Sequence, residues 1–302
     1  MSRSTISTFK LFELFPDEIS ARAYLESRLW PNGVTCPDCK SRERITTRKD
    51  GFYRCNACKL DFTVRTGTIF ERSHVPLHKW LYAMYLLVTA RKGISSMQLA
   101  KEIGITQKSA WFVLHRLREA CGTKLEMLRG DVETDETFIG GLEDNKHMSE
   151  RIRKGVAEKT GIIGMRQRGG PVVAQVLNSQ GGIAIQRAIR ANVQPGSRIL
   201  ADDNPRYIKL ADAYRIQTVK HSAGEYVRGD VHNNSVESVW ALLKRGLHGV
   251  YHKASKKHIG RYVNEFTFRL NQGNVARHTT ERLDSFVDAV VGKRITFAEL
   301  TA

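Results

Sequence analysis

The sequence predicts a multidomain α+β fold, in which a small metal-tied β module and a helical segment precede a larger α/β domain built on a mixed sheet. Two Cys-x-x-Cys pairs bracket short alternating stretches, a pattern typical of small strands held by a metal ion. Apolar residues then recur at helical spacing, and after Gly130 the period changes to the alternation of strands. The predicted parts are a helical lead-in (1–33), the metal-tied module (34–66), the helical segment (74–126), the sheet domain (130–272) and a polar tail (273–302).

The composition of the chain already restricts the class of molecule that it binds. The chain has 302 residues, with 48 Lys and Arg against 31 Asp and Glu, a formal charge of +17. Such an excess suits a polyanion better than an acidic small molecule or a membrane surface, and 41% hydrophobic residues exclude disorder as the main state. The longest apolar stretch, Trp80 to Ala90, is too short to cross a bilayer, and no signal peptide precedes it. We therefore expect a cytoplasmic protein without a membrane or small-molecule partner.

The first module carries a strong metal signature. Cys36 and Cys39 form one pair and Cys55 and Cys58 the other, with 15 residues between the pairs. This spacing lets two thiolate knuckles close a tetrahedral site, and four thiolates leave no open position, so we predict a structural zinc ion. A redox role would use one pair and leave the other unexplained. Cys121, at the end of an apolar helical run, is interpreted as a buried small hydrophobe.

The helical segment has the form of a helix-turn-helix. Ser95 or Ser96 can cap one helix, Gly104 can take the left-handed turn, and Thr106 can cap the next helix. The second helix would then bring its N-terminal end to the major groove of DNA. An ordinary three-helix linker is the alternative. The residues predicted to contact DNA, on or beside the polar face of this helix, are Gln107, Lys108, His115 and Arg118.

The sequence of the sheet domain predicts three strands followed by alternating helices and strands. The strand pattern covers 132–139, 161–168 and 172–178, with turn residues between the runs. A helix (183–191), a strand (198–201), a helix (206–213), a strand (214–220) and a long helix from about residue 234 follow. The order βββαβαβα predicts a mixed sheet whose helices are added after an antiparallel meander.

Three carboxylates fall at positions in this domain that suit metal chemistry. Asp135 lies in the middle of the first strand, where Asp is disfavoured, Asp202 follows a short apolar strand, and Glu237 lies in the first turn of the long helix. Cleavage of phosphodiester bonds with two Mg²⁺ ions needs hard oxygen ligands from separate elements. Asp202 and Asp203, which precede Pro205, can equally start a turn or cap the next helix. Glu237 can complete a capping box with Asn234 at the N-cap. The occurrence of all three carboxylates on these elements favours a catalytic metal site over separate structural roles.

With these motifs, the chain resembles bacterial insertion-sequence transposases that join an N-terminal zinc ribbon to a ribonuclease H-like Asp-Asp-Glu domain. The resemblance runs from about Leu25 to Gln272. Its most specific pieces, besides the ribbon, are Ser109-Ala110-Trp111-Phe112, Asp135-Glu136-Thr137-Phe138-Ile139-Gly140-Gly141 and His232-Asn233-Asn234-Ser235-Val236-Glu237-Ser238-Val239-Trp240.

The resemblance implies that Asp135, Asp202 and Glu237 hold two Mg²⁺ (or Mn²⁺) ions. Tyr207 lies five residues after Asp202, as in the family, which favours Asp202 over Asp203. Asn234 is the alternative third ligand, because Asn serves in some relatives. The basic residues after the third carboxylate would hold the DNA backbone; they are Lys244, Arg245, His248, His252, Lys253, Lys256 and Lys257.

The implied activity is strand cleavage and 3′-hydroxyl strand transfer at the terminal inverted repeats of a mobile element. Its partner would be double-stranded DNA, bound by a homo-oligomer that pairs two ends and associates with the nucleoid. Two alternatives stay open: a non-catalytic DNA-binding regulator, such as a decayed transposase, and a structure-specific nuclease of the same fold.

Overall fold

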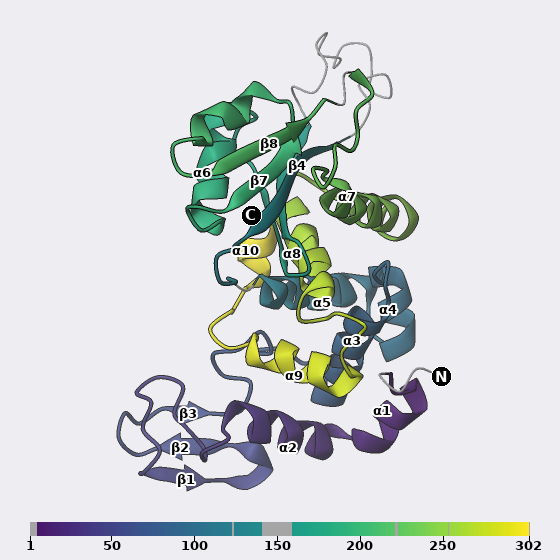
Figure 1. The fold of residues 1–302 in the computed structure, drawn as a ribbon. Coiled ribbons are helices and arrows are strands. Elements are labelled where there is room, and N and C mark those ends of the chain that lie inside the picture. Colours follow the sequence, from purple (N-terminus) through teal and green to yellow (C-terminus); the bar gives the residue numbers. More distant parts are fainter. Residues whose placement is uncertain (1–4, 123, 141–158, 221–222, 253, 302) are drawn as a thin grey trace. The chain divides into compact units, whose positions relative to one another are not determined.

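The computed structural model describes residues 5–122, 124–140, 159–220, 223–252 and 254–301 (Figure 1). The chain divides into two compact units, which are described separately. Unit 1 combines Met1–Thr123 with Gln272–Ala302, and unit 2 is Lys124–Asn271. Within the described ranges, no helix has both the length and the apolar character that a membrane crossing requires.

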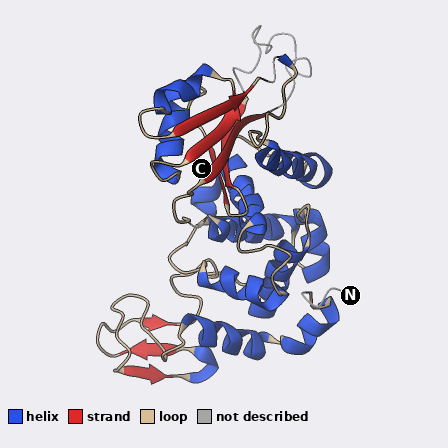
Figure 2. Cartoon of the chain, viewed as in Figure 1, coloured by secondary structure: helices blue, strands red, loops and turns tan. Residues whose placement is uncertain are grey.

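Unit 1 begins with two helices and the small three-stranded sheet drawn in red in Figure 2. The helices are α1 (Thr8–Leu14) and α2 (Glu18–Leu29). The strands β1 (Ile45–Thr47), β2 (Tyr53–Cys55) and β3 (Asp61–Phe62) pair antiparallel in that order, and the 3₁₀ turn η1 (Lys49–Gly51) joins the first two.

Aromatic rings join α2 to this sheet. Trp30, which follows α2, packs edge-on against the rings of Tyr53 and Phe62 at centroid distances of 5.4 and 5.9 Å. Tyr53 and Phe62 are buried and stack on each other. Because the sheet has so few residues, this aromatic cluster and the cysteines supply most of its core.

Three helices follow, as the periodicity predicts: α3 (Leu77–Thr89), α4 (Ser96–Ile103) and α5 (Gln107–Cys121). Their ends confirm the predicted local signals. The Ser95 side chain accepts a hydrogen bond from the Gln98 backbone N–H, Gly104 is left-handed with φ 63°, and the Thr106 side chain accepts from the Ser109 N–H. A glycine is favoured at such a position because it has no Cβ.

Residues 273–302, predicted as a polar tail, fold back onto unit 1 as α9 (Thr279–Asp288) and α10 (Phe297–Thr301). Leu283, Phe286 and Val287 form a buried stripe on α9. The Arg282 guanidinium is also buried and donates to the Val88 carbonyl oxygen at 2.6 Å. The sequence does not predict α9, because this helix buries only one narrow stripe of side chains. The residues that cover this stripe lie some 200 positions earlier in the chain.

Unit 2 is built on a five-stranded mixed sheet in the order β6-β5-β4-β7-β8 (Figures 1 and 2). β4 (Asp131–Ile139), β5 (Thr160–Gln167) and β6 (Val172–Val176) form an antiparallel meander, as predicted. β7 (Arg198–Asp202) and β8 (Arg215–Val219) extend the sheet in parallel on the other side of β4. The central strand β4 therefore has neighbours of both directions.

Helices cover both faces of this sheet. On one face, α6 (Gly182–Asn192) and the 3₁₀ helix η4 (Pro205–Leu210) pack around Ile163, Met165 and Ile199. On the other face, α7 (Asn234–Gly246), its π-helical continuation η6 (Leu247–Tyr251) and α8 (Ile259–Leu270) pack around Ile162. Since successive residues of a strand point to opposite faces, alternate residues of β4 face α7.

Candidate functional site

The four predicted cysteines lie together in unit 1. Their sulfur atoms all fall within 4.8 Å of one another, the one group of three or more potential ligands that meets this limit among the residues the structure describes. The Sγ atoms of Cys36 and Cys58, and those of Cys39 and Cys55, are 3.6 Å apart. A tetrahedral Zn²⁺ with Zn–S bonds of about 2.3 Å places its sulfurs roughly 3.8 Å apart. The cluster fits zinc and fills its coordination sphere.

The two knuckles share one backbone design. Lys40 and Lys59, each directly after the second cysteine of its pair, are left-handed with φ 61° and 65°. Backbone hydrogen bonds from Cys58 and Ala57 lower the pKa of the Cys55 thiol to about 6. At least one sulfur is thus favoured as the thiolate that binds metal.

In unit 2, Asp135 lies on the face of β4 that α7 covers. The Trp240 indole N–H of α7 donates to its Oδ2 at 2.9 Å. Burial, followed by repulsion from Glu136 and Asp202, raises the pKa of Asp135 to about 7. Crowded carboxylates of this kind are what a divalent cation neutralises.

Asp202 is the last residue of β7, beside Asp135. The parallel pairing of β4 with β7 aligns Glu133 with Leu200, and two residues further along each strand come Asp135 and Asp202. Both side chains therefore leave the sheet at matching positions on the same face. Asp203, by contrast, is exposed and lies outside the strand. The sequence also allowed these aspartates to cap the next helix, but Asn204 does so, by accepting from the Arg206 N–H at 3.1 Å.

Glu237 lies in the first turn of α7 with its side chain exposed, one turn before Trp240. The structure does not gather its carboxylate into a close ligand group with Asp135 and Asp202, since the cysteine cluster alone has that property within the described ranges. The capping box considered for Asn234 is not formed: Asn233 is the N-cap, and its side chain makes no capping hydrogen bond.

The residue that caps α7 is Glu133, which lies two residues before Asp135 on β4 and therefore on the same face of the sheet. Glu133 is fully buried. Its Oε2 accepts from the backbone N–H groups of Ser235 and Val236 at 2.8 and 3.2 Å, and its Oε1 accepts from the Arg168 guanidinium at 2.9 Å. Burial alone would raise its pKa, but the hydrogen bonds from Ser235 and Arg168 outweigh it and lower the pKa. A buried acid on β4 thus fixes the helix that carries Glu237.

On the opposite face of β4, Tyr207 ties the segment after Asp202 to the sheet. Its hydroxyl donates to Glu136 Oε1 at 2.8 Å, and its ring is buried among α6 and η4. Burial raises the pKa of Glu136 above its usual value. The tyrosine that the resemblance expects five residues after Asp202 is therefore an anchor for the end of β7.

Comparison with known proteins decides the family. Residues 127–271 match the ISXO2-like transposase domain, and residues 16–61 match the transposase zinc-ribbon domain. A protein in transposable element ISH50 of Halobacterium salinarum is 31% identical over 273 residues, which cover 84% of this chain and 91% of that protein. The chain belongs to the insertion-sequence transposases with an N-terminal zinc ribbon. The zinc-ribbon match begins before the predicted boundary at residue 34 and takes in α2, whose Trp30 packs on the ribbon.

Two solved complexes are also similar, but weakly. A simian T-cell lymphotropic virus intasome in complex with PP2A regulatory subunit B56 gamma matches at 14% identity and a TM-score of 0.29, over 61% of this chain and 68% of that one. A pre-cleavage Mos1 transpososome matches at 12% identity and a TM-score of 0.27, over 70% of this chain and 78% of that one. Scores this low do not define a shared fold.

The predicted DNA contacts of the transposase divide into exposed and buried residues. Gln107 and Lys108 are exposed at the start of α5, where Gln107 donates to the Ser96 hydroxyl at 2.8 Å and the Lys108 ammonium lies 4.8 Å from the Phe297 ring centre. His115 and Arg118 have 0% and 1% of their surface exposed. The prediction that these two lie at the polar face is wrong, because α5 is packed on several sides and carries them into the core of unit 1.

The basic residues beyond Glu237 keep their predicted exposure. Lys244, Arg245, His248, His252, Lys256 and Lys257 are all exposed in the transposase structure. Lys253 lies outside the described residues.

Removal of zinc is expected to unfold the ribbon, because the metal replaces the core that so short a sheet lacks. One Zn²⁺ per chain should be lost in Cys55→Ser, together with the protection of the Trp30 indole from quenchers. Elemental analysis and tryptophan fluorescence measure the two effects. Cys121→Ala, which removes a buried cysteine outside the cluster, should keep its zinc; a full equivalent of zinc in Cys55→Ser would contradict the assignment.

Gly164 has no side chain, and this allows the Trp240 ring to lie next to Asp135. It pairs with Asp135 across the β4–β5 ladder, and a Cβ on it would lie 2.5 Å from Trp240 Cζ2. Gly164→Ala should push the indole off Asp135 and weaken Mn²⁺ binding about tenfold or more, since a displacement near 1 Å is costly at such sites. Isothermal titration measures the affinity. Gly161→Ala on the same strand, where the nearest atom is 3.5 Å away, is the control and should bind Mn²⁺ normally.

Proposed function

We propose that this transposase cleaves DNA at the ends of its mobile element and joins the resulting 3′-hydroxyl groups to target DNA, with Asp135, Asp202 and Glu237 as ligands for two Mg²⁺ or Mn²⁺ ions. The observation that carries the proposal is the pair Asp135 and Asp202. These carboxylates lie at matching positions on neighbouring strands, and their repulsion contributes to the raised pKa of Asp135. Buried like charges cost free energy unless a cation is bound between them.

The strand order supports this assignment. An antiparallel meander followed by two parallel strands on the far side of β4 is consistent with the ribonuclease H-like domain that the resemblance implies. β7 ends at Asp202, level with Asp135 in the middle of β4, and α7, which carries Glu237 in its first turn, covers the same face of β4. We prefer Asp202 to Asp203 because Asp202 is in the strand, and Glu237 to Asn234 because only a carboxylate adds charge to balance the metal.

The residues around the carboxylates have positioning roles. The Trp240 indole donates to Oδ2 of Asp135 and so fixes the orientation of this carboxylate. Glu133 fixes the start of α7, and Tyr207 fixes the segment that follows Asp202. When bound, the two metal ions would supply activation of water or a 3′-hydroxyl and stabilisation of the leaving oxygen.

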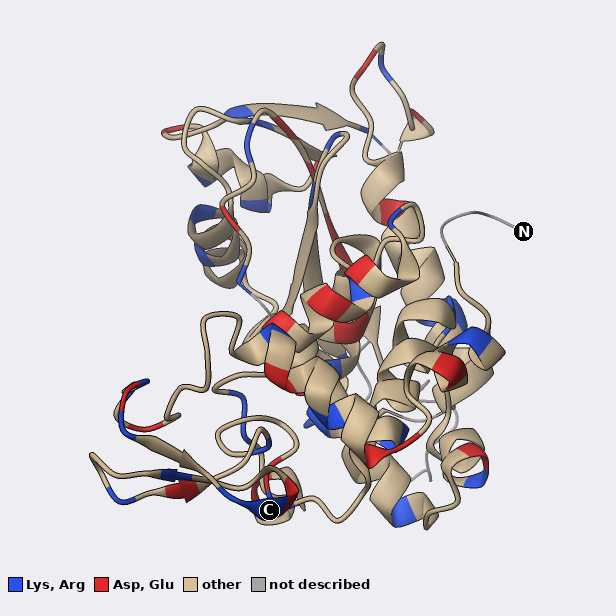
Figure 3. Cartoon of the chain, turned by 90° about the horizontal axis from the view of Figure 1, so that it is seen from below, with Lys and Arg blue, Asp and Glu red and all other residues tan. Residues whose placement is uncertain are grey.

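We also propose that the two basic segments on either side of the carboxylates bind DNA. Residues 67–130 carry 10 basic and 4 acidic side chains and residues 242–302 carry 11 and 5, whereas residues 131–241 carry 15 and 14. Lys and Arg are interspersed with Asp and Glu along the ribbon (Figure 3), so we expect each phosphate contact to involve a few neighbouring basic residues. We assign them to α4 and α5, as a helix-turn-helix with Gln107 and Lys108 at the DNA, and to Lys244, Arg245, His252, Lys253, Lys256 and Lys257. A homo-oligomer would pair the two ends.

A strand-transfer assay tests the proposal. Purified transposase is mixed with labelled DNA carrying the inverted repeats that flank its gene, with a supercoiled target plasmid, and with Mg²⁺, Mn²⁺ or EDTA. Joined products that need the divalent ion are expected. Cleavage of branched DNA without joining would identify a structure-specific nuclease, and binding without any metal-dependent product would identify a regulator; either result would overturn the proposal.

A further inference from the structure

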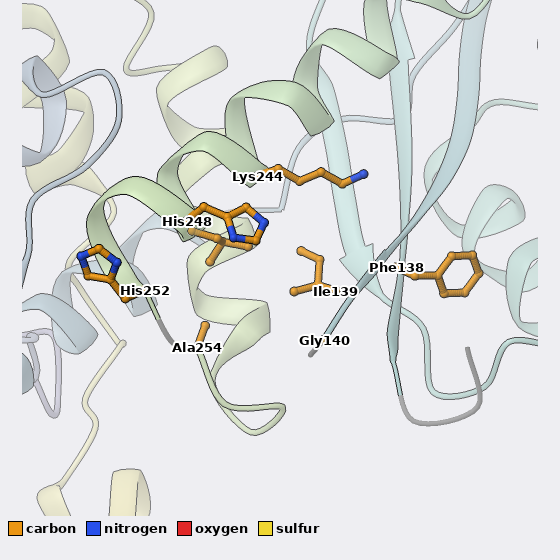
Figure 4. A pocket seen from close by; sticks show the side chains of 8 residues that line it. Phe138, Ile139, Gly140, Lys244, His248, His252 and Ala254 are labelled. Atoms are coloured by element: carbon orange, nitrogen blue, oxygen red, sulfur yellow. The ribbon is translucent and has the colours of Figure 1, made fainter. Parts of the chain in front are cut away.

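A cavity of about 390 Å³ lies in unit 2 where β4 ends. Ile139 and Gly140 line one side, and residues of α7, η6 and the turn after them line the other. Figure 4 shows His248 beside Ile139, the Lys244 side chain extending above Ile139 toward the strands, and His252 further along the chain. The cavity therefore lies beside the proposed active site, on the same strand and the same helix.

The lining has two chemical characters. Lys244 supplies a positive charge, His248 and His252 supply imidazole hydrogen-bonding groups, and all three are exposed. Ile139, Leu247 and Ala254 supply an apolar surface. A phosphate suits the first group and a sugar or base suits the second, and the volume is in the range that holds one small ligand. One nucleotide has both characters.

The backbone around the cavity is strained and firmly held. The helix α7 passes into the π-helix η6, and His252 follows with φ 57°, a backbone conformation that is unfavourable for residues other than glycine. The Tyr251 hydroxyl donates to Glu265 Oε1 at 2.6 Å, and Glu265 forms a buried ion pair with Arg269. Strain and π-helical turns held in this way concentrate at ligand sites.

The cavity lies a few nucleotides from the carboxylates. Ile139 is four residues beyond Asp135 on β4, a distance of about 13 Å at roughly 3.3 Å per residue. Lys244 is seven residues beyond Glu237 on α7, about 10 Å at 1.5 Å per residue. At the rise of a stacked B-form strand, about 3.4 Å per nucleotide, the cavity lies about three or four nucleotides from a phosphate held at the carboxylates, and an unpaired, more extended strand covers this distance with fewer.

We infer that this cavity binds one unpaired nucleotide of the DNA strand whose phosphate lies at the carboxylates, with its phosphate at Lys244 and His248 and its base against Ile139 and Ala254. The inference rests on the proposed function. It adds that the enzyme binds a DNA end with locally separated strands in preference to intact duplex. In addition to the charge of the backbone, the site would recognise the size and apolar surface of one nucleotide.

The test measures binding without cleavage. Fluorescein-labelled hairpins with a 20-base-pair stem are blunt, or carry four thymidines at the 3′ or the 5′ end, and are titrated with transposase in Ca²⁺ by fluorescence anisotropy. Wild type should bind one of the extended hairpins about tenfold more tightly than the blunt hairpin, or about 1.4 kcal/mol. Ala254→Trp, which fills the cavity, and Lys244→Ala with His248→Ala should both abolish this preference. The affinity of Ala254→Trp for the blunt hairpin should change less than about threefold, because this variant removes no phosphate contact. The double variant also loses the backbone contact proposed for Lys244, so it should bind the blunt hairpin more weakly, and it should bind the extended hairpin no more tightly than the blunt one.

Lys209→Ala removes an exposed lysine of unit 2 away from the cavity and should keep the preference. Since Lys244 and His248 are exposed, their replacement does not threaten folding, which thermal melting verifies. Equal binding of all hairpins by wild type, or a preference that survives in both cavity variants, overturns the inference. Because this test measures no cleavage, it is independent of the strand-transfer assay. If the protein joins DNA but shows no preference for an extended hairpin, the cavity inference is wrong and the proposed function stands. If it shows the preference but never joins DNA, the proposed function is wrong.

Discussion

Asp202→Asn is expected to reduce strand transfer about 10³-fold or more, a loss typical when a group that stabilises transition-state charge is removed. Asp203→Asn, which removes the same charge one residue later, should leave the rate within about threefold, because its side chain is exposed and outside β7 and such surface changes cost little. The measurement is the initial rate of joined product from pre-cleaved ends in Mg²⁺ and again in Mn²⁺.

The third ligand is decided in the same assay. Glu237→Gln should match Asp202→Asn and Asp135→Asn in its loss, whereas Asn234→Ala should stay near wild type, since Asn234 is exposed and its side chain does not cap α7. Equal rates for Asp202→Asn and Asp203→Asn would show that the aspartate pair on β4 and β7 is not the metal site. A severe loss in Asn234→Ala with none in Glu237→Gln would transfer the third position to Asn234.

Features set by local sequence are predictable. The knuckles require only two Cys-x-x-Cys pairs at a suitable spacing, and the caps at Ser95, Gly104 and Thr106 require only neighbouring residues. The alternation in β4, β5 and β6 has a period of two whatever the rest of the chain does. The meander and the cysteine cluster therefore follow from the amino-acid sequence alone, and the structure confirms both.

Features set by partners distant in the sequence are not predictable in this way. A capping box suits the start of α7 because its residues lie within four positions of one another, yet the cap is Glu133, about a hundred residues earlier. The sequence assigns His115 and Arg118 to a DNA surface because polar residues usually face solvent. Whether the surrounding face of α5 is covered depends on tertiary packing, and the return of α9 to unit 1 likewise depends on contacts with α3 that no local pattern records.

Glu133→Ala is expected to lower the free energy of unfolding by about 1–3 kcal/mol, less than for a fully buried ion pair because a quarter of the Arg168 side chain remains exposed to solvent. Arg168 would lose its carboxylate, and the Ser235 and Val236 N–H groups would lose their acceptor. Because α7 carries Glu237 and Trp240, strand transfer should also fall about 100-fold through misplacement of these groups. Urea denaturation and the strand-transfer rate measure the two effects.

A general loss of stability must be separated from release of the helix. Hydrogen exchange at the Ser235 and Val236 amides reports the start of α7 directly, and in Glu133→Ala these amides should exchange faster than the core of the sheet. Glu126→Ala, an exposed acid of the same unit, should alter neither exchange nor rate. In a double-mutant cycle, Glu133→Gln and Arg168→Met should couple by about 1 kcal/mol or more. Additive effects, or unchanged protection at Ser235, would mean that Glu133 is a packing residue and that α7 is positioned by its apolar face alone.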